Sequence, residues 1–318
     1  MTRITRRVGI LLSLTLAATF AVTSATVGSS SAATPTIGPG VQMNTVNAQC
    51  TANFVFRRVV TTYKTVNGQR VAVKTTHTYV GYAAHCASRG SDTQTNGCNT
   101  PSYPLGTKVQ FVLGEKGGSL GGLVGGSAGT VIGTGTLRYS SWIAMQRAHT
   151  TNSLACAYND LALVEVDRAY LGRVNPTVPY FGGPTALAAL PKVGQAVYTV
   201  GSSSQRGTTR ATSGTVKDAS AAPWSDIVKT RSSGVPGDSG SGYLNASGQA
   251  VGVLSTLNVS LLPPSSANGI GSLLQEVGFA RIHGASGLVL VPGRSAFNPA
   301  AAGQATSGGS LLGGLGIL

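Results

Sequence analysis

Strand-like patterns dominate the arrangement of apolar and polar residues along this chain. Residues 54–66 and 70–80 are rich in Val, Thr, Tyr and Phe, and they flank Asn67-Gly68. That pair is well suited to a two-residue hairpin turn because both positions favour positive φ. Short apolar runs predict further strands at 161–166, 196–200, 214–217 and 251–257. The pattern therefore predicts an all-β chain.

Only residues 272–284 predict a helix. Their apolar positions recur at helical spacing, at Leu273, Leu274, Val277 and Ala280, and Gly284 follows as a stop signal. Four prolines cluster between residues 172 and 192, which is typical of a connection between two halves. We therefore expect two β halves of similar size and a short C-terminal helix.

The first 33 residues have the composition of a secretory signal peptide. Arg3, Arg6 and Arg7 precede an apolar run over 8–22, and Ser31-Ala32-Ala33 fits a cleavage site. A signal peptide explains this order better than a membrane anchor does. No other stretch reaches the roughly 18 apolar residues that span a bilayer. The sequence thus predicts a secreted, extracellular protein.

Three further segments predict irregular structure. Residues 34–49 read as an irregular lead-in, and residues 296–318 read as a flexible tail rich in Gly, Ser and Leu towards its end. Residues 113–135 are glycine-rich and predict a flexible insertion. A phosphate-binding loop would need G-K-[ST] or G-x-G-x-x-G between a strand and a helix, and neither motif occurs there.

The charge balance is basic but dispersed. The formal net charge is +14, or +11 without the three arginines of the signal peptide. No compact Lys/Arg cluster is interleaved with aromatic residues, so we expect no nucleic-acid partner. A secreted basic protein can contact anionic cell-wall polymers, although the charge can equally serve solubility. We expect a monomer without a stable membrane anchor.

Cysteine usage points to disulfides rather than to a metal site. The four cysteines are Cys50, Cys86, Cys98 and Cys156, all in the exported part, where disulfides persist. No C-x-x-C pair exists, so we expect no zinc site, and no motif calls for a cofactor. Four cysteines allow three pairings, and their spacing does not choose among them.

A candidate nucleophile lies in VPGDSGSG, residues 235–242, where Ser239 stands between glycines. A serine hydroxyl needs a nearby base, and the base needs a third group that orients it. Of the four histidines, His85 stands out because it follows a strand directly and precedes a cysteine. Asp160 stands out because it opens the apolar run at 161–166, where an unpartnered charge is costly.

These segments resemble a known family. A-A-H-C at 83–86, N-D-L-A-L at 159–163 and G-D-S-G at 237–240, in that order, resemble the chymotrypsin-like (trypsin-like) serine proteases, in the style of their secreted bacterial branch. The resemblance covers roughly residues 50–290. It implies two six-stranded antiparallel β-barrels, at 50–183 and 184–295, and a serine endopeptidase that acts on protein or peptide substrates through an acyl-enzyme without a cofactor.

The resemblance also implies roles for individual residues. Ser239 would be the nucleophile, His85 the base and Asp160 the group that orients it, and the N–H groups of Gly237 and Ser239 would form the oxyanion hole. It implies a disulfide between Cys50 and Cys86, and with it one between Cys98 and Cys156. The side chain of Asp238 should be buried and need a cation, for which Arg206 and Arg210 are candidates.

Substrate contacts follow from the same resemblance. Residues 252–255 would pair with the substrate backbone, and Ser255, Thr256 and Leu257 would line the edge of the primary specificity pocket. Its floor would be Ser233, which is neutral, so a basic P1 residue is not favoured. We expect a small or medium apolar P1 residue. Ser241-Gly242 departs from the family, many of whose members have Gly-Pro there.

Two other functions are weighed against this one. An α/β-hydrolase would need G-x-S-x-G and the order Ser, acid, His, but Ser241 interrupts the motif and no βαβ pattern occurs. A protease-fold protein that binds the cell surface or wall without cleaving is the alternative that stays open.

Overall fold

The structure is a computed structural model, and it describes residues 36–46, 48–90, 95–117, 126–206, 208–258 and 267–307. Contacts divide the chain into two units, Met1–Ala32 and Ala33–Leu318, and every described residue lies in the second unit. The signal peptide expected at 1–33 therefore lies outside the described residues. No helix in the described ranges is long and apolar enough to cross a membrane.

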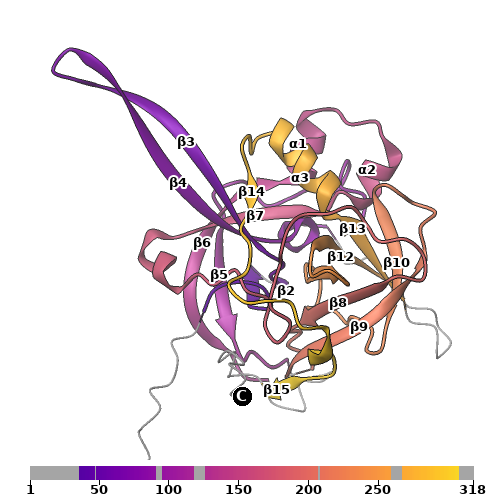
Figure 1. Cartoon of the computed structure of the whole chain (residues 1–318). Coiled ribbons are helices and arrows are strands. Elements are labelled where there is room, and N and C mark those ends of the chain that lie inside the picture. The colour runs from indigo at the N-terminus through magenta and orange to yellow at the C-terminus, as the bar shows by residue number, and fades with distance from the viewer. Residues whose placement is uncertain are drawn as a thin grey trace, which may run out of the picture. The chain divides into compact units, whose positions relative to one another are not determined.

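Eight antiparallel strands form the first sheet, in the order β14-β3-β4-β7-β6-β5-β1-β2 (Figure 1). They are β1 Gln42–Thr45, β2 Ala48–Thr51, β3 Val55–Val66, β4 Gln69–Ala83, β5 Lys108–Leu113, β6 Thr130–Ser140, β7 Leu161–Val166 and β14 Val289–Leu290. The core of this sheet holds large aromatic side chains that are fully buried, among them Phe54, Phe56, Tyr82 and Phe111.

The second sheet closes on itself. Its strands follow the order β10-β13-β12-β11-β8-β9-β15, and an additional β10–β9 pairing joins six of them into a barrel. They are β8 Ala196–Gly201, β9 Thr208–Asp218, β10 Ser225–Thr230, β11 Gly242–Asn245, β12 Ala250–Asn258, β13 Ala267–Ser272 and β15 Ala305–Ser307. The two-sheet, mostly β architecture agrees with the sequence pattern.

Helices are few and short within the described ranges. The α-helices are α1 Ser141–Arg147, α2 Ser153–Tyr158 and α3 Leu273–Ile282, and the 3-10 turns are η1 Ala84–Ala87, η2 Arg168–Arg173 and η3 Pro299–Ala301. Helix α3 matches the predicted helix, and Gly284 follows it at φ 132°. The β3–β4 hairpin also matches, with Asn67 at φ 51° and Gly68 at φ 78° in its turn.

The predicted lead-in at 34–49 is wrong. β1 pairs with both β2 and β5, and Ile37, Val41 and Met43 are fully buried. Strands of four residues give too short an alternation to be recognised in sequence, and here the pairing with β5 creates them. The C-terminal strand β14 also joins the first sheet, across the predicted boundary between the halves, by pairing with β3.

The predicted insertion at 113–135 and the flexible tail at 296–318 are both too long. β6 begins at Thr130, and its Gly133 and Gly135 pair with β5. A Cβ at either glycine would lie 2.6 Å from a neighbouring atom, so glycine here permits close packing rather than flexibility. In the tail, β15 pairs with β9, and the Phe297 ring packs edge-on against Tyr198. Residues 118–125 and 308–318 lie outside the described residues.

Candidate active site

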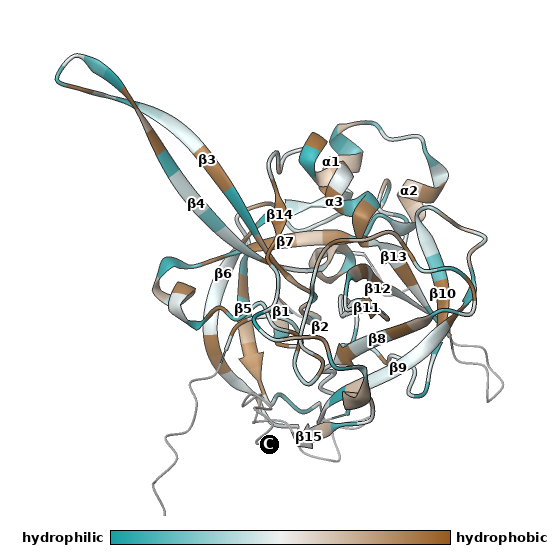
Figure 2. Ribbon diagram, viewed as in Figure 1, coloured by the Kyte–Doolittle hydropathy of each residue, from teal (hydrophilic) through white to brown (hydrophobic). Residues whose placement is uncertain are grey.

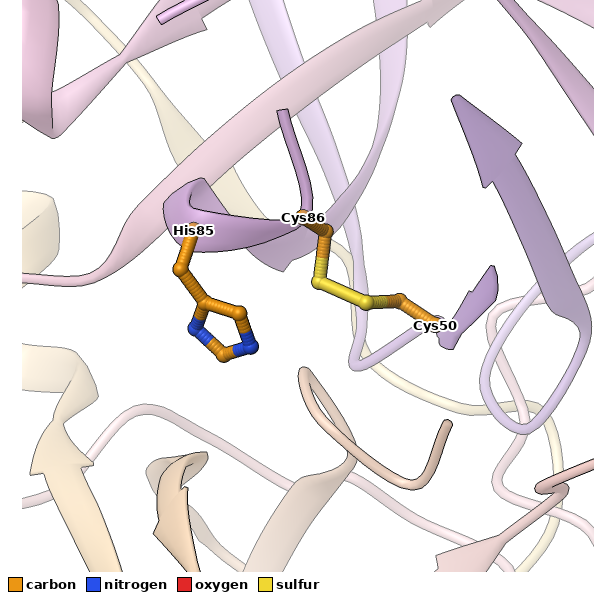
Figure 3. A group of neighbouring side chains, drawn as sticks. All are labelled: Cys50, His85 and Cys86. Carbon is orange, nitrogen blue, oxygen red and sulfur yellow. A yellow bond between two sulfur atoms is a disulfide. The ribbon is translucent and has the colours of Figure 1, made fainter. Parts of the chain in front are cut away.

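His85 is positioned by the end of β4. The strand ends at Ala83, which pairs with Leu161, the first residue of β7. The residues that follow Ala83 therefore lie next to the residues that precede Leu161, and these include His85 and Asp160. The 3-10 turn η1 then presents the His85 ring, and the disulfide between Cys86 and Cys50 attaches the turn to β2 (Figure 3). His85 Nδ1 lies 2.6 Å from Asp160 Oδ2, and the His85 backbone N–H donates to Asp160 Oδ1 at 2.8 Å.

Three donors surround the Asp160 carboxylate, which is 2% exposed. Besides the two groups of His85, the Ser255 hydroxyl donates to Oδ2 at 2.7 Å. An ionised carboxylate accepts hydrogen bonds only, so the His85 nitrogen that faces it, Nδ1, carries the proton. The other nitrogen, Nε2, is therefore the one able to accept a proton.

A second acid lies behind Asp160. The backbone N–H of Asp160 donates to Glu276 Oε1 of α3 at 3.0 Å, and Glu276 is fully buried. Burial raises the pKa of Glu276 well above its ordinary value, and the charge of Asp160 raises it further. Sequence reasoning missed this residue. Its signal was a glutamate between Leu273 and Ala280 on the apolar face of the predicted helix.

The loop before β11 presents Ser239 and is attached to the first sheet. The Thr51 N–H donates to the Ser239 carbonyl at 2.8 Å. Gly240 has φ 90°, and a Cβ there would lie 2.6 Å from the Thr51 carbonyl and 2.8 Å from the Ala83 nitrogen. Only glycine allows this close approach. Gly240, the residue after Ser239, thereby packs against Ala83 at the end of β4, two residues before His85.

Gly237 requires glycine for a similar reason. Its φ is 95°, and a Cβ would lie 2.4 Å from Gln49 Oε1. Its carbonyl accepts hydrogen bonds from Thr51 Oγ1 at 2.8 Å and Gln49 Nε2 at 3.1 Å, which fixes the peptide plane. The amides of Asp238 and Gly240 donate within the fold. Among the described hydrogen bonds of this loop, the N–H groups of Gly237 and Ser239 have no acceptor in the chain.

The Asp238 side chain is buried and partnered, as expected. The amides of Ser203 and Val235 donate to it at 2.9 and 3.1 Å, and Arg206 Nε lies 3.4 Å from Oδ2. Burial raises the pKa of Asp238, and the nearby Arg206 charge opposes that rise. Of the two arginines considered, Arg206 is the ion-pair partner, whereas Arg210 is exposed and reaches only the Ser232 hydroxyl.

The predicted pairing of residues 252–255 with substrate needs correction. Gly252 and Val253 already pair with β11 on one side and β13 on the other, and Leu254 N donates to the Ser241 carbonyl. Beyond Leu254, β12 pairs only with β13 among the described strands. An unpaired edge therefore begins at Ser255, because a central strand has no backbone groups left for a peptide.

The expected pocket residues lie in this region. Thr256 pairs with Gly269, where a Cβ would lie 2.1 Å from Thr256 Oγ1. The side chain of Leu257 lies outside the described side chains, so its part in the pocket stays a prediction. The carbonyl of Ser233 accepts from the Arg206 guanidinium, and the next amide, of Gly234, donates to Asn268 Oδ1 at 2.9 Å. The predicted pocket floor is thus attached to Arg206, in the loop before β9, and to β13.

Both disulfides implied by the resemblance are present, Cys50–Cys86 and Cys98–Cys156. The ligand atoms of Cys50, His85 and Cys86 lie within 4.8 Å of one another. Their sulfurs are bonded to each other (Figure 3), so neither is a thiolate that could bind a metal ion. The Trp142 ring of α1, which is buried, lies 6.5 Å from the His85 ring.

The other histidines lie apart from this site. His77 Nδ1 is 2.5 Å from Glu165 on the neighbouring strand β7, and the His77 side chain is partly buried. His283 stacks on Phe279 at the end of α3, and His149 is exposed after α1.

One protein-family model matches part of the chain. The trypsin-like peptidase domain family matches residues 125–253, which include Asp160 and Ser239 but not His85. No curated protein sequence matches the chain.

Among solved structures, a glutamic acid specific serine protease described as using a histidine triad in substrate binding is 17% identical over 80% of this chain and 100% of its own, with a TM-score of 0.40. The thermostable serine protease AL20 from an extremophilic microorganism is 13% identical over 76% and 97%, with a TM-score of 0.38. The HtrA-type protease AlgW is 10% identical over 77% and 64%, with a TM-score of 0.35.

The family match and the fold together define the class of protein. Residues 125–253 match a trypsin-like peptidase domain, and the fold is mostly β, of the chymotrypsin-like two-barrel type. It is a serine endopeptidase, a hydrolase of peptide bonds, and its substrate is a protein or peptide. Membership of the secreted bacterial branch stays a prediction.

Proposed function

We propose that the protein is a secreted serine endopeptidase that cleaves peptide bonds with a triad of Ser239, His85 and Asp160. The observation that carries the proposal is the short contact between His85 Nδ1 and a buried Asp160 carboxylate that also holds the His85 amide. Together these contacts fix one tautomer of the ring and its orientation. That is the arrangement required of a histidine that acts as the base for a serine nucleophile.

Each step of the reaction uses a group in this site. His85 Nε2 takes the Ser239 proton as Oγ attacks the substrate carbonyl, and Asp160 stabilises the imidazolium that forms. The N–H groups of Gly237 and Ser239 donate to the negative oxygen of the tetrahedral intermediate, and one such donor lowers the barrier by about 3 kcal/mol. His85 then protonates the leaving amine, and water releases the acyl-enzyme by the same route.

Substrate binding is proposed at the edge of β12 beyond Leu254. A peptide that pairs with Ser255, Thr256 and Leu257 would extend the sheet as an antiparallel strand. The neutral Ser233 at the proposed pocket floor offers no carboxylate to pair with a basic P1 residue, and the nearby Asp238 carboxylate is already paired with Arg206. We therefore keep a small or medium apolar P1 residue as the proposed preference.

Secretion is proposed from the N-terminal sequence and the disulfides. The segment at 1–33 has the features of a signal peptide, and two disulfides are typical of an oxidising compartment.

Fluorophosphonate labelling tests the proposal. The intact protein should take up the label, and Ser239→Ala should abolish both the label and casein hydrolysis. Ser241→Ala is the matched control, since it removes a serine from the same loop but one whose hydroxyl binds the Asp238 carbonyl. Labelling that survives in Ser239→Ala, or an unlabelled wild-type protein, would contradict the proposed nucleophile and favour a binding protein without activity. A peptide-library profile of the wild-type enzyme tests the P1 preference.

A further inference from the structure

The β3–β4 hairpin continues well beyond the sheet that holds its base (Figure 1). β4 pairs with β7 only from Tyr79 onward, and β3 pairs with β14 only at Phe56 and Arg57. The nine pairs from Arg58–His77 to Val66–Gln69 therefore have no third strand among the described elements. At about 3.3 Å per residue they form a two-stranded ribbon about 30 Å long. We call this ribbon, together with the Arg57–Thr78 pair at its base, the arm, residues 57–78.

The arm concentrates one sign of charge. Residues 57–78 contain five Lys and Arg residues and no Asp or Glu. The chain without its signal arginines has 20 basic residues, so the arm carries a quarter of them in 22 positions. Figure 2 shows hydrophilic stretches along both strands of the projecting part. The basic residues that looked dispersed in sequence are thus gathered on one projecting element.

The strand register places three of these five cations on one face and the other two, Arg58 and Lys64, on the opposite face. Opposed residues of an antiparallel pair share a face, and faces alternate along each strand. Arg57, Lys74 and Arg70 therefore lie on one face at every fourth position, about 13 Å apart. Four threonine hydroxyls share this face, from Thr61, Thr65, Thr76 and Thr78. Phosphate oxygens accept hydrogen bonds from both ammonium or guanidinium groups and hydroxyls.

The ribbon is exposed on both faces along most of its length. Tyr63 and Val59 are 57% and 51% exposed, and every residue from Thr61 to Ala72 is exposed. A two-stranded ribbon without a covered face is only marginally stable in water. Charged residues, lysine in particular, protect such strands against aggregation, and the same cations are available to an anionic partner. The single sign of charge points to an anionic partner.

We propose that the arm binds a flexible phosphodiester polymer of the cell surface, of the poly(glycerol phosphate) kind, and thereby holds the secreted enzyme at the wall. A flexible chain with one phosphate per repeat can follow the spaced cations of a straight ribbon. Binding of this kind needs no pocket, and the arm offers none. The proposal uses the extracellular location proposed above but does not depend on catalysis.

Two other anionic partners fit the arm less well. Single-stranded nucleic acid is held by a series of aromatic rings on which bases stack, whereas the arm has one aromatic ring, Tyr63. The Arg70 guanidinium already lies 4.1 Å from the centre of that ring. An anionic bilayer is bound by cations next to several large apolar side chains that insert, whereas the cationic face holds only two, Val59 and Tyr63, among its four threonines.

The test compares two triple variants of the whole secreted chain. The arm variant is Lys64→Gln, Arg70→Gln and Lys74→Gln, three exposed residues without an ion pair in the described part of the chain. The matched control is Arg147→Gln, Lys192→Gln and Lys217→Gln, which removes the same charge from exposed positions outside the arm. A third variant replaces residues 61–74 by Asn-Gly, which retains the Val60–Thr75 pair as the end of a short hairpin.

Binding is measured to immobilised poly(glycerol phosphate) between 50 and 200 mM salt, with single-stranded DNA and phosphatidylglycerol vesicles as alternative targets. The arm variant and the shortened hairpin should bind the polymer at least tenfold more weakly than the wild type, and the control less than twofold. The slope of log affinity against log salt should fall by about two for the three removed charges. Peptide hydrolysis should be unchanged in all three variants, which verifies their folding and separates this test from that of the triad.

Three results would overturn the proposal. They are unchanged polymer binding by the arm variant, an equal loss in the matched control, and arm-dependent binding that is tighter to DNA or to vesicles than to the polymer.

Discussion

Replacing Glu276 by glutamine tests whether the buried acid behind Asp160 is neutral. Glutamine has nearly the same shape, and its carbonyl oxygen can still accept the hydrogen bond from the Asp160 amide, which spans 3.0 Å. The substitution therefore removes only the ability to ionise. Because burial raises the pKa of Glu276, the native protein has to keep a proton on this group that the unfolded chain has released.

The sign of the effect follows from this difference. Below the ordinary pKa of 4.5, both states hold the proton and the substitution should change little. Above it, the wild type loses about 1.4 kcal/mol of unfolding free energy per pH unit relative to Glu276→Gln, until the pH reaches the raised native pKa. The glutamine variant should thus become progressively more stable than the wild type as the pH rises.

Denaturant unfolding of both proteins at a series of pH values from 4 to 8 measures this difference. Glu165→Gln is an informative control. Burial raises the pKa of Glu165, but hydrogen bonds from His77 and Arg138 outweigh it, so the pKa is lowered overall. That variant should become less stable than the wild type as the pH rises. If the stability difference between Glu276→Gln and the wild type were independent of pH, or if the variant became less stable than the wild type as the pH rises, the inference that Glu276 is neutral in the native protein would be refuted.

Alanine at the same position separates the charge from the hydrogen bond. Glu276→Ala leaves the buried Asp160 amide without its acceptor, which costs about 1–3 kcal/mol of unfolding free energy. Under the proposed function it should also lower kcat, because that amide helps to hold the residue that orients His85. Glu276→Gln should retain kcat within a few-fold, and equal losses in both variants would contradict the positioning role.

Three further predictions concern other parts of the fold. Burial raises the pKa of Asp226 to about 6. In unfolding titrations, the unfolding free energy of Asp226→Asn should therefore rise by up to about 3 kcal/mol relative to that of the wild type between pH 4 and pH 7. Arg206→Gln leaves the Asp238 carboxylate buried without its cation, and thermal unfolding should show a loss of about 3–5 kcal/mol, part of which Asp238→Asn restores. The double variant Cys98→Ser and Cys156→Ser opens a loop of 58 residues, and denaturant unfolding should show a loss of about 4 kcal/mol of unfolding free energy. An unchanged unfolding free energy would contradict this expectation.

Local signals predicted much of the architecture. The Asn67-Gly68 turn, the β7 run and the α3 spacing are properties of consecutive residues, and each element lies where its pattern placed it. Motif order likewise singled out His85, Asp160 and Ser239. The structure brings His85 and Asp160 into contact because β4 and β7 are neighbours that end at the same place.

Other features depend on partners that are distant in sequence. The strands β1, β2 and β15 are too short to show a period, and they exist because β5 and β9 offer edges to pair with. Gly133 and Gly135 read as flexible, yet a Cβ at Gly135 would lie 2.6 Å from the Glu165 carbonyl of β7, and a Cβ at Gly133 would lie 2.6 Å from the Ile37 side chain. The basic residues of the arm lie at irregular sequence positions, and only the hairpin register aligns three of them, Arg57, Arg70 and Lys74, on one face.

By itself, the sequence therefore determined the β class, the hairpin turn, the helix and the residue types of the site, because each is encoded within a few neighbouring positions. Only the tertiary structure decided that Arg206 rather than Arg210 pairs with Asp238, that Glu276 lies behind Asp160, and that β12, among the described strands, pairs on one side only beyond Leu254. These contacts join residues far apart in the chain. Their energies depend on burial and on which strands become neighbours, and no local pattern records either.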